Sequence, residues 1–443
     1  MSNAVGGSTT TIGNPTRGRW WIVIAALLLQ FSIGAVYAWS VFSTAFKKPE
    51  AMELTNPQAS LPFTVTIGMI FVGSYIGGRL QDKVGPRPVA LTGGIIYGIG
   101  NVLASFTGGH DAGQLWLLVT GYGVIAGFGL GFAYIVPIAM LQKWFPDKRG
   151  LITGLAVAGF GFGAVATAPV AQWLIAMNPD RPAWAFLPLG IGYLVLSLIG
   201  ASFFRNPPAG YQVPGWVPAA AGRVKDAYKQ FTESEALRTP QWYLLTAILT
   251  LNVTVGIALI AQANSTAEDV AGYTAAGAAT LVGVLALFNG GGRIFWAWVS
   301  GFTGRMGAFG LMLALQGVCL LVIPHASNAA LFFILAAVIY LCYGGGFGTM
   351  PATAGDFFGV KHAGAIYGLM IVGWSLGGII GPPIIAGLIG GDKNYTLGYT
   401  VIGIIALVAL ILPVITKMPG RKQEPAAPMA ERRPEATGEA AVR

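Results

Sequence analysis

Long apolar runs follow one another along nearly the whole chain, and they restrict its fold more than any other feature. An α-helix needs roughly 20 mostly apolar residues to cross a lipid bilayer. Twelve such runs cover residues 20–46, 58–80, 88–107, 113–142, 151–177, 183–204, 240–262, 272–300, 308–324, 328–354, 363–390 and 395–416. They are too long for barrel strands and lack the alternation of a transmembrane β-strand. The sequence therefore predicts an all-α membrane protein with twelve transmembrane helices, surrounded by the lipid bilayer.

The charged residues predict how these helices are oriented. Only 10% of the residues are charged, against about a quarter in soluble domains. Of 26 Lys and Arg residues, 21 fall in the termini and the even-numbered loops, one (Arg293) lies within a run, and four lie in odd-numbered loops, namely Lys47, Lys48, Arg181 and Lys393. Because basic residues collect in cytoplasmic loops, both termini are expected to be cytoplasmic. This topology also explains the net charge of +9, so no nucleic-acid partner is expected.

The longest polar stretch divides the chain into two halves. We expect a cytoplasmic N-terminal tail at 1–19, a six-helix bundle at 20–204, a cytoplasmic linker at 205–239, a second six-helix bundle at 240–416 and a disordered cytoplasmic tail at 417–443. The last segment is polar and rich in Pro and Ala, a composition that cannot bury enough apolar surface to fold.

The two halves repeat each other at a fixed offset of 214 residues. The matching pairs are Gly131 and Gly345, Pro137 and Pro351, Gly150 and Gly364, Gly154 and Gly368, Leu155 and Leu369, Gly159 and Gly373, Gly163 and Gly377, and Pro169 and Pro383. Unrelated helices with similar packing needs would not keep this register. Duplicated halves are typical of transporters that rock one helix bundle against another around a site near the bilayer midplane.

The turn between the second and third runs reads GGRLQDKVGPRP and resembles the signature of the major facilitator superfamily. The signature positions are Gly78, Asp82, Gly85 and Arg87. The resemblance implies a gating role, in which the acidic and basic residues lock neighbouring helix ends in one conformation and release them in the other. An ordinary basic cytoplasmic turn is the alternative. The second half keeps Gly304 and Arg305, but Gly301 stands where the Asp would be, which argues against symmetric gating.

Three further segments resemble one branch of that superfamily. WFPDKRGLITGLAVAGFGFG (144–163) is similar to both oxalate/formate antiporters and monocarboxylate transporters. LRTPQWYLL (237–245) and QFSIGAVYAWSVF (30–42) are similar to the bacterial oxalate/formate group. The resemblance implies a transporter of small organic anions, expected to be monomeric and to lie in the bacterial cytoplasmic membrane.

Arg293 is the one unambiguous charge within the apolar runs, and a membrane-embedded Arg costs on the order of 2.5–3.5 kcal/mol on insertion scales. It could clasp a substrate carboxylate through two parallel hydrogen bonds. Alternatively, it could extend along the helix to the cytoplasmic interface. The resemblance favours the first role, because these families carry an anion-binding Arg in this helix. Asn289 lies one turn earlier on the same face, where monocarboxylate transporters of animals carry an Asp that takes part in proton coupling.

The family resemblance also gives the expected walls of the substrate site. Aromatic residues align at Tyr37, Tyr134, Phe160, Tyr343, Phe347 and Trp374. Plain helix packing is the alternative for any one of them. In oxalate antiporters a second cation, a Lys, stands where this chain has Trp374. A single cation neutralises one carboxylate, and a dianion would remain half unpaired at a high cost. A monocarboxylate such as lactate, pyruvate or formate is therefore favoured over oxalate.

The coupling ion stays open at this point. Arg does not release its proton under working conditions, and no acid lies deep in a run, so exchange of one anion for another is favoured over proton symport. His362 is a candidate for proton-linked gating, although a solvated loop residue is the simpler interpretation. A channel, an enzyme and a carboxylate sensor without flux are the other classes. The chain lacks a continuous polar lining and a catalytic constellation, so we expect neither an enzyme nor a cofactor or metal.

Overall fold

The computed structural model describes residues 15–108, 112–208, 211–213, 230–359 and 362–419. Within these residues the fold is entirely helical, as predicted. The first part of the chain forms α1 (Pro15–Ile33), η1 (Gly34–Ala38), α2 (Trp39–Phe46), α3 (Asn56–Val84), α4 (Pro86–Ala104), η2 (Ala112–Gln114), α5 (Leu115–Leu118), η3 (Val119–Ala126), α6 (Gly127–Trp144), α7 (Arg149–Gly161), α8 (Ala164–Met177), η4 (Pro182–Ala185) and α9 (Phe186–Ser202). The second part forms α10 (Glu233–Ala236), α11 (Pro240–Asp269), α12 (Ala275–Thr303), α13 (Arg305–Val322), η5 (Ile323–His325), α14 (Ala329–Phe358), α15 (Ala363–Met370), α16 (Val372–Ile389), α17 (Tyr395–Val408) and α18 (Ile411–Ile415).

Most of the predicted spans are present as long apolar helices. Across the described ranges, 11 helices are long and apolar enough to cross a membrane, several of them built from two consecutive elements. The remaining predicted span corresponds to α4, whose 19 residues include several Gly and the buried Asn101. This helix packs between α6 and α9, so the protein interior covers much of its less apolar surface.

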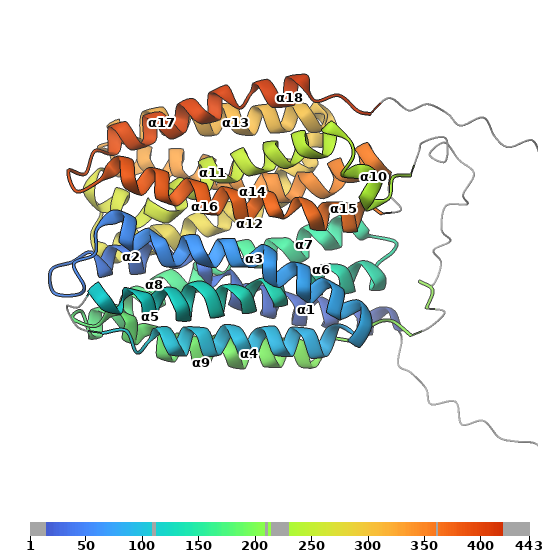
Figure 1. The fold of residues 1–443 in the computed structure, drawn as a ribbon, viewed down its shortest axis with the longest axis horizontal. Coiled ribbons are helices and arrows are strands. Elements are labelled where there is room, and N and C mark those ends of the chain that lie inside the picture. Colours follow the sequence, from blue (N-terminus) through green and yellow to red (C-terminus); the bar gives the residue numbers. More distant parts are fainter. Residues whose placement is uncertain (1–14, 109–111, 209–210, 214–229, 360–361, 420–443) are drawn as a thin grey trace, which may run out of the picture.

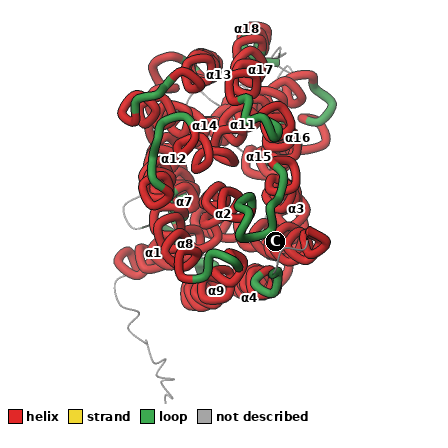
Figure 2. The backbone as a smooth tube through the Cα atoms, turned by 90° about the vertical axis from the view of Figure 1, so that its left-hand side faces the viewer, coloured by secondary structure: helices red, strands yellow, loops and turns green. Residues whose placement is uncertain are grey.

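The helices form two groups that lie side by side. Helices α1–α9 make up one group and α11–α18 the other, which is clearest in the view along the helix axes (Figure 2) and in the side view (Figure 1). Much of the predicted linker, and most of both predicted tails, lies outside the described residues. The described part of the linker includes Phe231, whose N–H donates to the carbonyl of Phe358 at 2.9 Å.

The two groups meet along three seams, which place the interior of one against the other. Helix α12 packs against α7 and α8, α16 packs against α3, and α11 packs against α2. Glycines allow the close approach: a Cβ on Gly161 would lie 2.7 Å from the Cα of Gly290 across the first seam. Small residues at such crossings let membrane helices pack by backbone contact.

Two helices are interrupted at the same crossing. The first span changes from α-helix to 3₁₀-helix at Gly34, and the fifth breaks between Gly161 and Ala164. Gly34 and Gly163 touch backbone to backbone there, with no room for a Cβ on either residue. The break carries Tyr37 into the interior, where its ring meets that of Phe160 with centroids 5.2 Å apart.

Helix α11 is longer than the sequence predicted. The predicted span ended at 262, because the residues that follow are polar. The helix continues to Asp269. Ser265, Glu268 and Asp269 are tolerated because they line a pocket at this end of the molecule and do not face lipid.

Candidate functional site

Arg293 lies deep in the interior, on the side of α12 that faces the other helix group. It is ten residues before Thr303, the last residue of the helix, which corresponds to about 15 Å at 1.5 Å per residue. The side chain is completely buried, with 0% of its surface exposed. It therefore does not extend to the membrane interface, which removes the alternative role considered from the sequence.

The guanidinium has no anionic partner among the described residues, and the hydroxyls of Tyr37 and Tyr134 are among its polar neighbours. Its Nε, Nη1 and Nη2 atoms are buried and form no hydrogen bond within the described residues. An unpaired buried charge is costly, so a negatively charged group placed beside Arg293 would be stabilised. The sequence could identify Arg293 itself but not its lack of a partner.

Asn289 lies one turn before Arg293 and is also fully buried. Both atoms of its side-chain amide are without a hydrogen-bond partner in the described part of the chain, so it forms no hydrogen bond with the guanidinium. Its backbone carbonyl, like that of Arg293, is covered by a glycine of α14: a Cβ on Gly344 would collide with the Asn289 oxygen, and one on Gly348 with the Arg293 oxygen. Gly344 and Gly348, four residues apart on α14, thus determine where Asn289 and Arg293 lie along the crossing of α12 and α14.

The six aromatic residues expected around the site form one connected cluster. Their ring centroids lie 5.0–5.7 Å apart in the pairs Tyr37–Phe160, Tyr37–Tyr343, Tyr134–Phe160, Tyr134–Trp374, Phe160–Trp374, Tyr343–Phe347 and Phe347–Trp374. Arg293 points into this cluster, with its Cζ atom 4.9 Å from the ring centroid of Phe347 and 5.8 Å from that of Phe160. Cation–π attraction of this kind contributes about 0.5–2 kcal/mol, far less than an anion would supply.

Polar groups in the cluster come from both helix groups. The hydroxyls of Tyr37 and Tyr343 are 2.9 Å apart and join the first group to the second. The Tyr134 hydroxyl and the Trp374 Nε1 atom have no hydrogen-bond partner among the described residues. The same holds for the hydroxyl of Tyr367, which is buried and feels the charge of Arg293. Tyr367 was not predicted as a site residue, although it stands next to Gly368, one of the positions that repeat between the two halves.

Comparison with known proteins identifies the family. A sequence profile of the Major Facilitator Superfamily matches residues 19–382 and 302–441. The chain belongs to the major facilitator superfamily. It is a transporter and not an enzyme, in line with the prediction from its sequence.

Named relatives place the chain within this superfamily. It is 32% identical over 372 residues to the oxalate:formate antiporter of Oxalobacter formigenes, covering 82% of each protein. It is 27% identical to the uncharacterized MFS-type transporter YhjX of Escherichia coli, covering 83% of this chain and 88% of that protein. Monocarboxylate transporter 13 of Rattus norvegicus is 28% identical, with 89% and 88% covered. The branch suggested by the sequence motifs is thus confirmed.

Solved structures of the superfamily confirm the fold. The crystal structure of a D-xylose-proton symporter superposes with a TM-score of 0.69 at 14% sequence identity, covering 89% of this chain and 97% of that one. A bacterial homologue of the lysosomal transporter Spinster, in an inward-facing and unoccupied conformation, gives a TM-score of 0.63 at 15% identity, with 93% and 96% covered.

The superfamily signature lies far from the aromatic cluster, at the turn between α3 and α4. Gly85 has a φ of +87°, a conformation that glycine adopts without strain, and Arg87 is exposed. A Cβ on Gly78 would meet only the Ile135 side chain, at 3.8 Å, so this glycine is not required by close packing. The side chain of Asp82 lies outside the described residues. The gating role of this turn stays a prediction.

The corresponding turn of the second half has a glycine in a similar conformation and an ion pair with another helix. Gly304 has a φ of +75° between α12 and α13. Arg305 follows it and donates from Nε to Asp356 of α14 at 2.8 Å, and also to the hydroxyl of Ser300. The acid that the motif lacks at Gly301 is therefore replaced by one from another helix.

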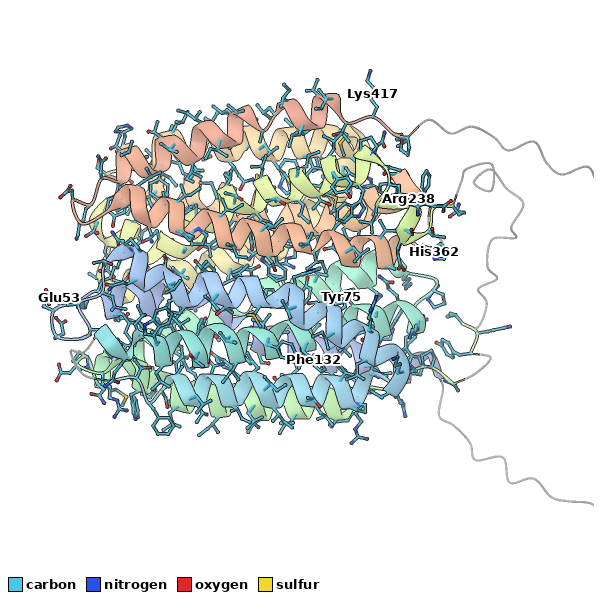
Figure 3. All side chains as sticks on the ribbon, viewed as in Figure 1. Glu53, Tyr75, Phe132, Arg238, His362 and Lys417 are labelled. Atoms are coloured by element: carbon cyan, nitrogen blue, oxygen red, sulfur yellow. The ribbon has the colours of Figure 1, made fainter. Side chains whose placement is uncertain are left out.

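His362 is not part of the aromatic cluster. It is half-buried and precedes α15, at the end of the molecule that carries Arg238 and Lys417 (Figure 3). Its expected neighbour Lys361 lies outside the described residues. A proton-linked role for His362 stays a prediction.

The Tyr37–Tyr343 bond gives a first testable expectation. Tyr37→Phe leaves the Tyr343 hydroxyl buried without its partner, which costs about 1–3 kcal/mol. We expect a lower melting temperature in detergent. Tyr340→Phe is the matched control, because the Tyr340 hydroxyl is buried one turn away and has no partner in the described residues. It should leave the melting temperature unchanged or raise it. Equal losses in both variants would contradict a bond between the two groups.

Proposed function

We propose that this transporter carries small monocarboxylates of the lactate, pyruvate or formate class by alternating access, with Arg293 as the anion ligand. The unpartnered, fully buried guanidinium is the observation on which the proposal rests. A carboxylate could accept two parallel hydrogen bonds from it. Asn289, Tyr134 and Tyr367 each offer a further unused polar group in the same region.

The surroundings of Arg293 favour a singly charged guest with a short apolar tail. The walls are aromatic, and a tyrosine or tryptophan offers an apolar face with one polar atom. The cluster has Trp374 where oxalate antiporters have a Lys, so Arg293 is its only cation among the described residues. A second carboxylate would be left without a counter-charge.

Charge balance supports exchange of anions. The empty site carries one positive charge, and the loaded site is neutral. No carboxylate in the described ranges pairs with Arg293, and its neighbour on the same helix face is Asn289 rather than an acid. Moving the unpaired charge through a closed intermediate is unfavourable in a low-dielectric interior, so the empty carrier should return slowly.

Exchange makes a clear prediction in proteoliposomes. Vesicles preloaded with a carboxylate should take up the labelled anion about tenfold faster than empty ones, since the loaded carrier crosses without a bare charge. Asn289→Asp is the informative variant. It places a negative charge one turn from Arg293, so the empty site becomes neutral and the loaded site negative. Crossing of the loaded carrier then limits both experiments, and the rates into empty and preloaded vesicles should become similar. Equal uptake rates of the wild-type protein in preloaded and empty vesicles would rule out obligatory exchange.

The substrate class is tested by competition among formate, acetate, lactate, pyruvate and oxalate. A monocarboxylate should compete best. The 32% identity to an oxalate:formate antiporter makes oxalate/formate exchange the second candidate, and strongest competition by oxalate would establish it instead. Specific binding without any flux would indicate a carboxylate sensor.

Orientation follows from the distribution of basic residues. We propose that the end at which α1 begins and α18 ends is cytoplasmic and that the opposite end faces the outside. In this assignment the protein is a multi-pass protein of the bacterial cytoplasmic membrane, and it works as a monomer.

A further inference from the structure

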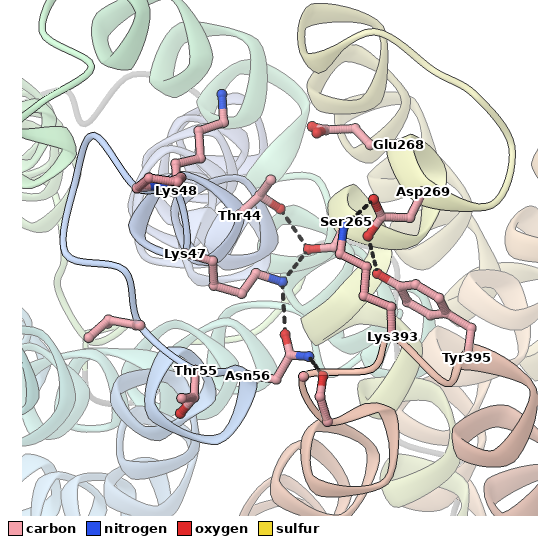
Figure 4. Close-up of a pocket in the computed structure, with 14 residues that line it drawn as sticks. Thr44, Lys47, Lys48, Thr55, Asn56, Ser265, Glu268, Asp269, Lys393 and Tyr395 are labelled. Carbon is pink, nitrogen blue, oxygen red and sulfur yellow. Dashed lines mark hydrogen bonds and ion pairs between the residues drawn. The ribbon is translucent and has the colours of Figure 1, made fainter.

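A pocket of about 440 Å³ lies between the two helix groups, at the end of the molecule opposite Pro15 and Lys417 (Figures 1 and 3). It is distinct from the aromatic cluster. Its lining comes from the end of α2, the loop that follows, the start of α3, the last turn of α11 and the segment between α16 and α17. It includes Thr44, Lys47, Asn56, Ser265, Asp269 and Lys393 (Figure 4).

Hydrogen bonds across this pocket join one helix group to the other. Lys47 of the first group donates from Nζ to the hydroxyl of Ser265 in the second, at 2.7 Å, and to Oδ1 of Asn56 at 3.1 Å. The hydroxyls of Thr44 and Ser265 are 2.8 Å apart. Asn56 in turn donates to the carbonyl of Gly390 in the second group. The pocket is thus held closed by polar contacts in which Lys47 supplies the charge.

Both carboxylates of the pocket accept hydrogen bonds from groups other than Lys47. Asp269 accepts from Lys393 Nζ at 2.8 Å and from the Tyr395 hydroxyl at 2.6 Å. Glu268 accepts from the Asn264 amide at 2.7 Å. The two acceptors of Lys47 are neutral, so its charge faces the pocket without an anionic partner.

A line of unused polar groups connects the pocket to the aromatic cluster. Ser40 is one turn from Thr44 along α2, and Gln262 is one turn from Ser265 along α11, and these two helices pack together. The Ser40 hydroxyl and both polar atoms of the Gln262 amide are buried and have no partner in the described residues. The next turn of the first span brings Tyr37, which belongs to the cluster around Arg293.

We propose that this pocket is a second carboxylate site, at which Lys47 binds the substrate anion before it reaches Arg293. The proposal rests on the carboxylate transport inferred above. A carboxylate on Lys47 takes the place of Ser265 as its acceptor and thereby breaks the charged contact between the two helix groups. Binding at this end and opening of this end are then one event, and Ser40 and Gln262 receive the anion on its way inward.

The protonation of Lys47 adds a pH signature. Burial lowers the pKa of Lys47 to about 8, and the charge of Lys393 also lowers it, while Asp269 and Glu268 raise it. The ammonium therefore loses its proton as the pH rises through about 8, and the affinity for external anion falls in the same range. The substrate carboxylates stay ionised throughout.

The transport test uses right-side-out proteoliposomes and the monocarboxylate that competes best in the panel above. Lys47→Gln should raise KM for the external anion about tenfold, because a charge-assisted hydrogen bond is lost, and leave KM for the internal anion unchanged. Lys47→Arg should keep a low KM and abolish its rise above pH 8. Lys48→Gln, which removes an exposed charge at the rim, is the matched control. An external KM unchanged in Lys47→Gln would overturn the proposal.

A labelling test does not depend on transport. Gly391 lines the pocket, is exposed and has open space for a side chain, so Gly391→Cys serves as a reporter thiol. An anionic methanethiosulfonate should react about tenfold faster than a neutral one of similar size, since local positive charge concentrates anions. Adding Lys47→Gln should abolish the difference, and adding Lys48→Gln should not. If no carboxylate of the panel is transported but this difference is present, the transport proposal fails and the anion site stands. Equal rates for both reagents would refute the anion site.

Discussion

Arg293→Gln is expected to abolish carboxylate transport while leaving a folded protein. Removing one partner of a buried, hydrogen-bonded charge pair costs about 2–5 kcal/mol, so uptake should fall about 100-fold or more. The measurement is exchange of labelled monocarboxylate in preloaded proteoliposomes. Arg293→Lys should recover only part of the activity, because an ammonium does not reproduce the two parallel hydrogen bonds of a guanidinium.

The same variant has a second expected effect, which separates a ligand role from a structural one. The empty site holds an unpaired buried charge, so removing it should raise the melting temperature of the ligand-free protein or leave it unchanged. The original protein should gain stability with added carboxylate by mass action, and Arg293→Gln should gain none. A large loss of stability in the ligand-free variant would instead show that Arg293 holds the fold together.

Gly348→Leu is expected to prevent stable folding. A Cβ at this position already collides with the backbone oxygen of Arg293, and the crossing of α12 and α14 cannot open without moving the whole helix. Overpacking in a dense interior typically costs about 1–3 kcal/mol, and a collision with backbone leaves no side chain that can move aside. Yield of monodisperse protein after detergent extraction is the measurement.

Gly348→Ala is the milder form, expected to lower the melting temperature and to weaken substrate binding because it displaces the backbone of Arg293. Gly291→Ala is the matched control on α12, where nothing lies within 4 Å of the added Cβ. If Gly291→Ala and Gly348→Ala behaved alike, close packing at Gly348 would not be what positions the site.

The helical spans and the buried Arg could be predicted from the sequence because few structures satisfy the physical requirements of these residues in lipid. Twelve apolar runs leave helical spans as the only solution in lipid. A lone Arg within them requires an interior partner or a route to water. The six aromatic residues were found through a family resemblance, and the contacts that join them into one cluster were visible only in the structure.

Other features were missed because their sequence signals are ambiguous. The sequence of the last turn of α11, with Ser265 and Asp269, predicts a loop, since polar residues normally mark the end of a transmembrane span. Only the pocket explains why this turn stays helical. The break at Gly34 could not be foreseen either, because a glycine in a membrane helix is more often a packing position than an interruption. Lys47 was assigned to a loop, and its bond to Ser265 depends on a segment more than 200 residues away.

The seam of α12 with α7 and α8 is a place where the backbones of the two helix groups approach closely. A Cβ on Gly161 would lie 2.7 Å from the Cα of Gly290, and the ring of Phe162 fills the space that a side chain on Gly290 would need. Rocking at this crossing therefore requires the Phe162 ring to slide over the backbone at Gly290, and the dispersion contacts of that ring are exchanged step by step. The barrier to rocking then includes the polar contacts that join the two groups, namely the Tyr37–Tyr343 bond in the interior and the Lys47–Ser265 bond at the pocket, where solvent and passing anions can compete for the lysine.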